Sequence, residues 1–213
     1  MKLNKKKIAV VSLIVCIIAI LSLGSLAWYT ANDTVVNTLS FVTNFQMDLI
    51  EHDADGKVVG ADGDTTGITF NRVRPNADLK KDPTVINKSF AEDQWVRMSV
   101  TVSKASEWAK VVTAGSDLSK IFTGFDDTAW TRYGATPEIS GDTVTYTYYL
   151  NNKLAAGKSA TLFTGVHIPE TITDGSKLDG TTITVKAEAM QASDLGAGVK
   201  DAYTAFNNPT KAK

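Results

Sequence analysis

The densest group of side chains with metal-binding chemistry lies in residues 51–62. With Gly56 in the sixth place, acidic residues fall at places one, three, five and twelve, which is close to the ligand spacing of a calcium-binding loop. The calcium candidates are Glu51, Asp53, Asp55 and Asp62. The residues before this stretch alternate as in a β-strand, whereas such a loop normally lies between two helices. We therefore favour a β-hairpin with an Asp-Gly turn and keep the four acidic residues as the alternative.

The chain offers no recognisable catalytic constellation. His52 and His167 are far apart in sequence, and a catalytic zinc needs three protein ligands. Residues 157–159, Gly-Lys-Ser, resemble the end of a phosphate-binding loop, but Asn152 stands where that motif needs a glycine. The single cysteine, Cys16, lies in the N-terminal apolar stretch. We therefore expect a protein that is not an enzyme and that needs no cofactor.

Residues 1–27 have the three parts of a secretory signal peptide. Four lysines precede an apolar stretch over residues 8–26, and the small residues Ser25 and Ala27 stand at the third and first positions before a cut. We expect a signal peptidase to cleave between Ala27 and Trp28, so that only the signal contacts the membrane. The alternative is an uncleaved anchor, because the apolar stretch approaches the length of a bilayer span.

Composition narrows the role of the mature chain. Loss of the four signal lysines changes 22 basic against 23 acidic residues into a net charge of about −5. A mildly acidic chain without basic clusters is a poor binder of nucleic acid. Because Cys16 leaves with the signal, no disulfide can form, and the fold depends on its core alone.

Hydrophobic alternation with a period of two dominates the mature chain and predicts β-strands. Long strands are expected at residues 39–50, 95–103, 143–150, 160–168 and 181–192, and shorter ones at 67–70, 84–87 and 130–133. Short helices are expected at residues 105–112, 116–122 and 197–206. About eight strands in one domain predict a mainly β protein, a two-sheet jelly-roll sandwich with a few short helices, preceded by the hydrophobic signal helix.

The N-terminal junction also carries a likeness to a known family. Residues 23–34 read Leu-Gly-Ser-Leu-Ala-Trp-Tyr-Thr-Ala-Asn-Asp-Thr, with an aromatic pair just past the cut, and an Asn and an apolar strand follow. Further matching stretches lie at residues 81–89, 95–100, 148–150, 162–163 and 183–191. In these features the chain resembles the TasA/camelysin family, exported proteins of Gram-positive bacteria whose signal is cut by a dedicated signal peptidase.

The resemblance implies a jelly-roll domain and a structural role. Well-known members build biofilm-matrix fibres by donating an N-terminal strand to the next subunit, so the implied partner is a second copy or a related fibre subunit. It also implies secretion to the matrix or cell surface. The chain is shorter than the main fibre formers, and the old peptidase label of the family has no catalytic site here.

The residues themselves suit strand donation. The expected organisation is signal 1–27, assembly segment 28–38, jelly-roll domain 39–206 and polar tail 207–213. In the assembly segment, the residues expected to make contact are Trp28, Tyr29, Val35 and Val36. A free β-prone terminus can pair with an exposed sheet edge of a neighbour.

A binding module is the second hypothesis. Jelly rolls often serve as lectins, and aromatic side chains on the surface could stack on sugars. The candidates are Trp108, Trp130 and Tyr133, and the alternative is that these side chains fill the core.

Overall fold

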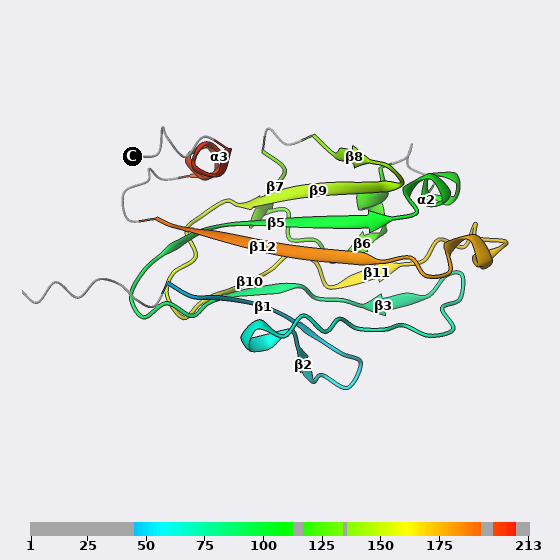
Figure 1. The fold of residues 1–213 in the computed structure, drawn as a ribbon, viewed down its shortest axis with the longest axis horizontal. Coiled ribbons are helices and arrows are strands. Elements are labelled where there is room, and N and C mark those ends of the chain that lie inside the picture. The colour runs from blue at the N-terminus through cyan, green and yellow to red at the C-terminus, as the bar shows by residue number, and fades with distance from the viewer. Residues whose placement is uncertain (1–44, 113–116, 134–135, 193–197, 208–213) are drawn as a thin grey trace, which may run out of the picture. The chain divides into compact units, whose positions relative to one another are not determined.

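The computed structural model describes residues 45–112, 117–133, 136–192 and 198–207 of the 213-residue chain. All of them belong to the compact unit Asn44–Lys213. The signal segment and the assembly segment lie outside the described residues. The described part is mainly β, with several antiparallel sheets and two α-helices (Figure 1).

The longest strands form a five-stranded antiparallel sheet. Its order is β12 (Ile183–Gln191), β5 (Gln94–Ser103), β9 (Thr143–Leu150) and β7 (Trp130–Thr131), and β8 (Glu138–Ser140) also pairs with β9. The alternating pattern explains the placement, because the apolar set of each strand points to one face and the threonines point to the other. β5 pairs along nearly its whole length with β12 on one side and β9 on the other.

Two smaller antiparallel sheets complete the fold. The four-stranded sheet has the order β10 (Ser159–Thr161), β4 (Thr84–Asn87), β1 (Met47–His52) and β2 (Val58–Val59). The three-stranded sheet has the order β3 (Asp78–Lys80), β11 (Gly165–His167) and β6 (Phe122–Thr123).

One hydrophobic core joins the three sheets. Val85 of β4, Val100 of β5 and Val166 of β11 are buried in the same cluster. The chain passes repeatedly from one sheet to another, since β4 and β5 follow each other in sequence but pair in different sheets. In Figure 1, β9, β5 and β12 of the five-stranded sheet lie above β1 and β3 of the two smaller sheets.

The helices are short and lie at the margins of the sheets. α2 (Ala105–Val111) turns Trp108 into the core, and α3 (Val199–Asn207) covers the outer face of the five-stranded sheet near Trp95. The 3-10 turns are η1 (Ala61–Gly63), η2 (Leu118–Ile121) and η3 (Gly175–Leu178). Neither α-helix of the described part is long and apolar enough to cross a membrane.

Most predicted strands are confirmed, and three of the predictions need correction. The stretch 160–168 is not one strand: β10 ends at Thr161, and the buried Leu162 and Phe163 carry the chain across to β11 in the other sheet. Residues 67–70 form no strand at all. The helix predicted at 116–122 is the single 3-10 turn η2, which Asp117 caps by accepting a hydrogen bond from the Ser119 N–H.

Candidate functional site: an open sheet edge beside an apolar groove

The calcium candidates lie in and after the hairpin that joins β1 to β2. Asp53 Oδ1 accepts hydrogen bonds from the backbone N–H groups of Asp55 (3.0 Å) and Lys57 (2.8 Å). Gly56 adopts a left-handed φ of 81°, as the turn requires. The Asp53 carboxylate therefore already serves the turn, and Asp55 lies exposed beside it.

The remaining two candidates have other surroundings. Glu51 on β1 forms an ion pair with Lys81, with 2.5 Å between Oε1 and Nζ, and both side chains are largely buried. Asp62 belongs to η1, beyond β2. Within residues 45–112, 117–133, 136–192 and 198–207, no three His, Cys, Asp or Glu side chains are grouped so as to hold a metal ion. The geometry of this stretch is that of a hairpin with its own hydrogen bonds.

The two histidines each have a separate carboxylate partner. His52 Nδ1 lies 2.8 Å from Asp82 Oδ2, and the His52 backbone N–H donates to the other oxygen of the same carboxylate. His167 Nδ1 lies 2.8 Å from Asp78 Oδ1. These pairs lie in different sheets, one on β1 and the other on β11. Each pair ties a strand to a neighbouring segment.

Two of the three aromatic side chains considered for sugar stacking fill the core. Trp108 is 4% exposed and Trp130 is 1% exposed. The indole N–H of Trp130 donates to the Thr161 carbonyl at 2.9 Å, which links β7 to β10. Tyr133 is half-buried, with its ring edge-on to Tyr203 of α3. A stacking platform for sugars therefore has no support from the two tryptophans.

Among the described residues, β12 is paired along only one of its two edges. It pairs with β5 on one side, and no other described strand pairs with it. The Ser103 N–H donates to the Thr182 carbonyl and the Ala192 N–H donates to the Asp93 carbonyl, each at 3.0 Å. Since hydrogen-bonded positions alternate in an antiparallel ladder, the even-numbered residues of β12 bond to β5. The odd-numbered residues direct their N–H and C=O groups to the open edge.

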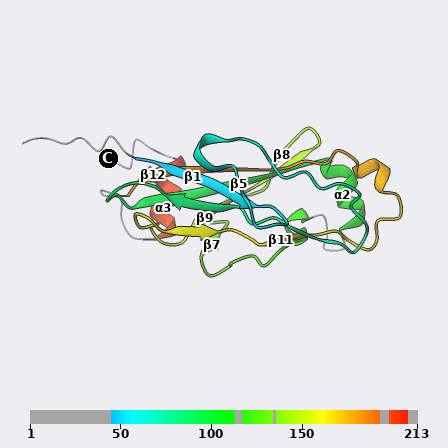
Figure 2. The same cartoon turned by 90° about the horizontal axis from the view of Figure 1, so that it is seen from below.

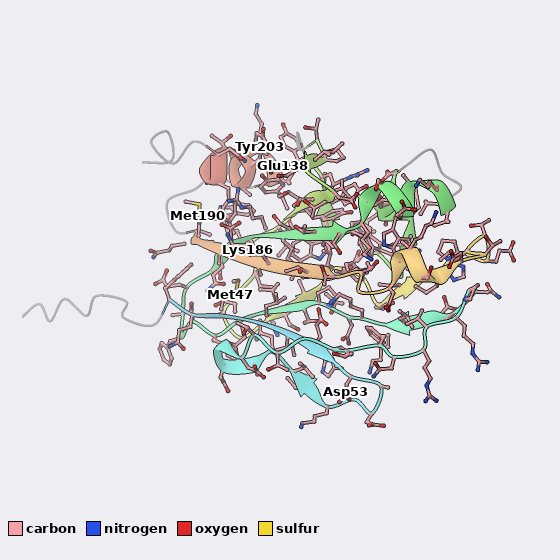
Figure 3. The ribbon with its side chains drawn as sticks, turned by 45° about the vertical axis from the view of Figure 1, so that its right-hand side comes forward. Met47, Asp53, Glu138, Lys186, Met190 and Tyr203 are labelled. Carbon is pink, nitrogen blue, oxygen red and sulfur yellow. The ribbon has the colours of Figure 1, made fainter. Side chains whose placement is uncertain are left out.

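Side chains on β12 follow the same alternation. The odd-numbered Ile183, Val185, Ala187 and Ala189 contact the core, whereas Lys186 is exposed on the outer face. Figure 3 labels Lys186 and Met190 on β12 and Met47 on β1, the neighbouring strand of the other layer. β12 and β1 are in contact, although no ladder joins them. An added strand at this edge would thus meet a row of free backbone groups and inward apolar side chains.

An apolar groove of about 820 Å³ opens beside the first residues of β12. Its lining includes Leu79 and Val166 from the three-stranded sheet, Ile168 just after β11, Trp108 from α2, and Ile183 from β12. Residues 67–75 form another part of the lining. The groove therefore offers apolar contacts next to unpaired backbone groups, which is what a strand with alternating apolar side chains requires.

The groove and the start of β1 lie toward opposite ends of the compact unit. Figures 1 and 2 show β1 beginning at the left, while β3 and α2, which both line the groove, lie toward the right. Two aromatic side chains are exposed near the start of β1: Phe45 is 39% and Phe90 is 92% exposed. Hydrogen bonds of Gln46 hold these two segments side by side. The Gln46 carbonyl accepts from the Lys88 N–H, and the Gln46 N–H donates to the Ser89 hydroxyl.

The residues predicted for processing and assembly cannot be placed in this site directly. The cleavage residues Ser25, Ala27 and Trp28 and the assembly residues Tyr29, Val35 and Val36 lie outside the described residues. The described chain begins at Phe45, just before β1. The open edge of β12 is a feature that the sequence did not predict, because alternation alone does not show whether a strand has one neighbour or two.

Comparison with protein-family models, with curated proteins and with solved structures gives no match.

Proposed function

We propose that this protein is a secreted structural subunit of the cell surface or biofilm matrix of a Gram-positive bacterium, and that it assembles into fibres by N-terminal strand donation. The observation that carries the proposal is the open edge of β12 beside an apolar groove. On this proposal the sheets form a jelly roll, residues 1–27 are the signal helix removed by signal peptidase, and the partner is a second copy or a related fibre subunit.

The open edge supports assembly because such edges are normally protected. A long strand with unpaired N–H and C=O groups is a template for another chain, and soluble proteins usually shorten, cover or charge it. β12 is nine residues long, and its ladder to β5 runs over all nine. Its inward-facing residues are apolar at four successive alternate positions. Such an edge fits a protein that uses it for pairing.

The proposed donor is long enough to reach a neighbour. Residues 28–44 follow the predicted cleavage site and precede the described domain. An extended chain of that length spans about 55 Å at roughly 3.3 Å per residue. Asp33 is the only charged side chain in this stretch, so insertion of residues 29–44 between strands desolvates a single charged side chain.

The placement of the two elements favours a filament over a closed dimer. If the arm leaves near the start of β1 and the next subunit accepts it toward the other end, each contact joins unlike surfaces. Contacts of this head-to-tail kind propagate unless a rotation closes them into a ring. Mature subunits would therefore polymerise into an open-ended filament.

Electron microscopy of the mature chain tests this proposal. Residues 28–213 should form fibres, and a variant comprising residues 39–213 should not, because it has the groove but lacks the assembly segment 28–38. Added to the mature chain, the armless variant should shorten the fibres, since it accepts an arm and donates none. Equal assembly by both chains, or assembly by neither, would reject strand donation. Unchanged fibre length in the mixture would reject the groove as acceptor.

A further inference from the structure

Residues 67–71 have the sequence of a strand but no strand partner. They read Gly-Ile-Thr-Phe-Asn, and Ile68 and Phe70 alternate with polar residues in the pattern that predicts a half-buried strand. In the structure they belong to no ladder, and their backbone groups make no hydrogen bond to another described residue. Several backbone groups of this β-prone segment therefore have no partner within the described part of the chain.

This segment lies on the lining of the groove beside β12. Residues 67–71 and the β12 residue Ile183 line the same groove, so a chain that enters the groove would lie close to both. Ile68 and Phe70 are half-buried, whereas Thr69 and Asn71 are exposed. The extended run ends at Arg72, whose φ of 55° places it in the left-handed region that interrupts a strand.

We propose that residues 67–71 form a conditional strand, which completes only when the N-terminal arm of a second copy of this chain enters the groove. β12 can satisfy one edge of the arm, and an arm paired on that edge alone has a second, open edge. The conditional strand supplies the missing partner, so that the arm is hydrogen-bonded on both sides. This inference rests on strand donation and adds the second half of the acceptor site.

Charge identifies the occupant as the arm of this chain. Arg72 and Arg74 are exposed on the groove lining directly after the conditional strand. The only charged side chain in residues 28–44 is the carboxylate of Asp33, and cleavage leaves the α-amino group of Trp28 at the far end of the arm. An acid that enters between strands is favoured beside guanidinium groups, which bind carboxylates in a fixed planar geometry. The arginines thus favour an arm with an acid near its middle over an uncharged strand.

Hydrogen exchange of the mature chain, before and after fibre formation, tests the conditional strand. In the monomer the amides of residues 67–71 should exchange rapidly, and in fibres alternate amides of this segment should become protected together with odd-numbered amides of β12. The exposed Asp127, whose N–H makes no hydrogen bond to another described residue, is the internal control and should exchange rapidly in both states. Fibres in which β12 gains protection but residues 67–71 do not would overturn this inference and leave strand donation intact. Absence of fibres would reject both.

Charge exchange tests the occupant. Asp33→Lys should slow fibre growth by up to about fivefold, the range expected for an ion pair with partial exposure. Combining it with Arg72→Glu and Arg74→Glu should restore the rate. Lys158→Glu with Lys200→Glu makes the same change in net charge on other exposed residues and should give no rescue. Equal rescue by both pairs, or by neither, would overturn the pairing of Asp33 with the two arginines.

Discussion

Proline substitutions at two neighbouring positions of β12 distinguish the edge that pairs with β5 from the open edge. The register assigns the Lys186 N–H to the ladder with β5, opposite Ser99, and the Ala187 N–H to the open edge. Proline lacks the N–H in both cases. Lys186→Pro therefore removes a bond of the folded monomer, whereas Ala187→Pro removes a group that the monomer does not use and that a donated strand would need.

The expected costs differ several-fold. Loss of the Lys186 bond costs about 1 kcal/mol, and the Ser99 carbonyl left without its partner adds roughly 1–3 kcal/mol. A total of about 2–4 kcal/mol corresponds to a fall in melting temperature of roughly 4–15 °C for a domain of this size. Ala187→Pro should cost about 1 kcal/mol or less, because proline is tolerated on an edge strand when its nitrogen faces away from the ladder.

Two measurements on the same proteins check this reasoning. Thermal unfolding should show the large loss only for Lys186→Pro, and microscopy should show loss of fibres for Ala187→Pro although that monomer stays folded. Ala187→Ser keeps the N–H and controls for the altered side chain. Equal destabilisation by the two prolines would refute the register at the open edge. Normal fibres from Ala187→Pro would refute β12 as the acceptor.

Four other outcomes are expected. Trp130→Phe should lower the free energy of unfolding by about 2–3 kcal/mol, measured in urea, because the Thr161 carbonyl loses its donor and the smaller ring leaves a cavity in the core. The hydrogen bond from Arg97 lowers the pKa of Glu188 below 4.5, so Glu188→Gln should cost less than about 1 kcal/mol at pH 7, and the difference should vanish as the pH falls through the lowered value. Millimolar calcium should produce no binding heat in calorimetry, and a saturable heat would contradict the hairpin interpretation of residues 51–62. Ala27→Arg should block cleavage and abolish extracellular fibres, and normal fibres would separate processing from assembly.

Local pattern predicted the long strands well. Apolar and polar residues alternate strongly along β5 and β9, because one face of each strand is buried in the core and the other is more exposed. This alternation can be recognised in the sequence. The predicted short strand at 84–87 also coincides with β4. The prediction of one strand at 160–168 was wrong because both halves of this stretch are β-prone although they belong to two different strands. The buried Leu162 and Phe163 cross the core between sheets, and local pattern does not distinguish such a crossing from a strand interior.

Long-range partners determine the rest of the site. The acidic spacing at residues 51–62 suggested calcium, but Lys81, thirty positions from Glu51, forms an ion pair with that carboxylate. The open edge of β12 likewise depends on the rest of the fold, because it exists only where no second described strand lies beside β12. The same holds for residues 67–71, whose strand pattern needs a partner that the described part of the monomer does not supply.

If the protein assembles by strand donation, as proposed, the separation between the start of β1 and the groove has a consequence for fibre growth. A row of subunits joined by arms has two unlike ends, one with an empty groove and the other with an unused arm. Such a fibre is polar, so the two ends can elongate at different rates and a single capping protein can arrest only one of them. On a cell that releases subunits from its own membrane, this polarity would set which end stays close to the surface and which extends outward.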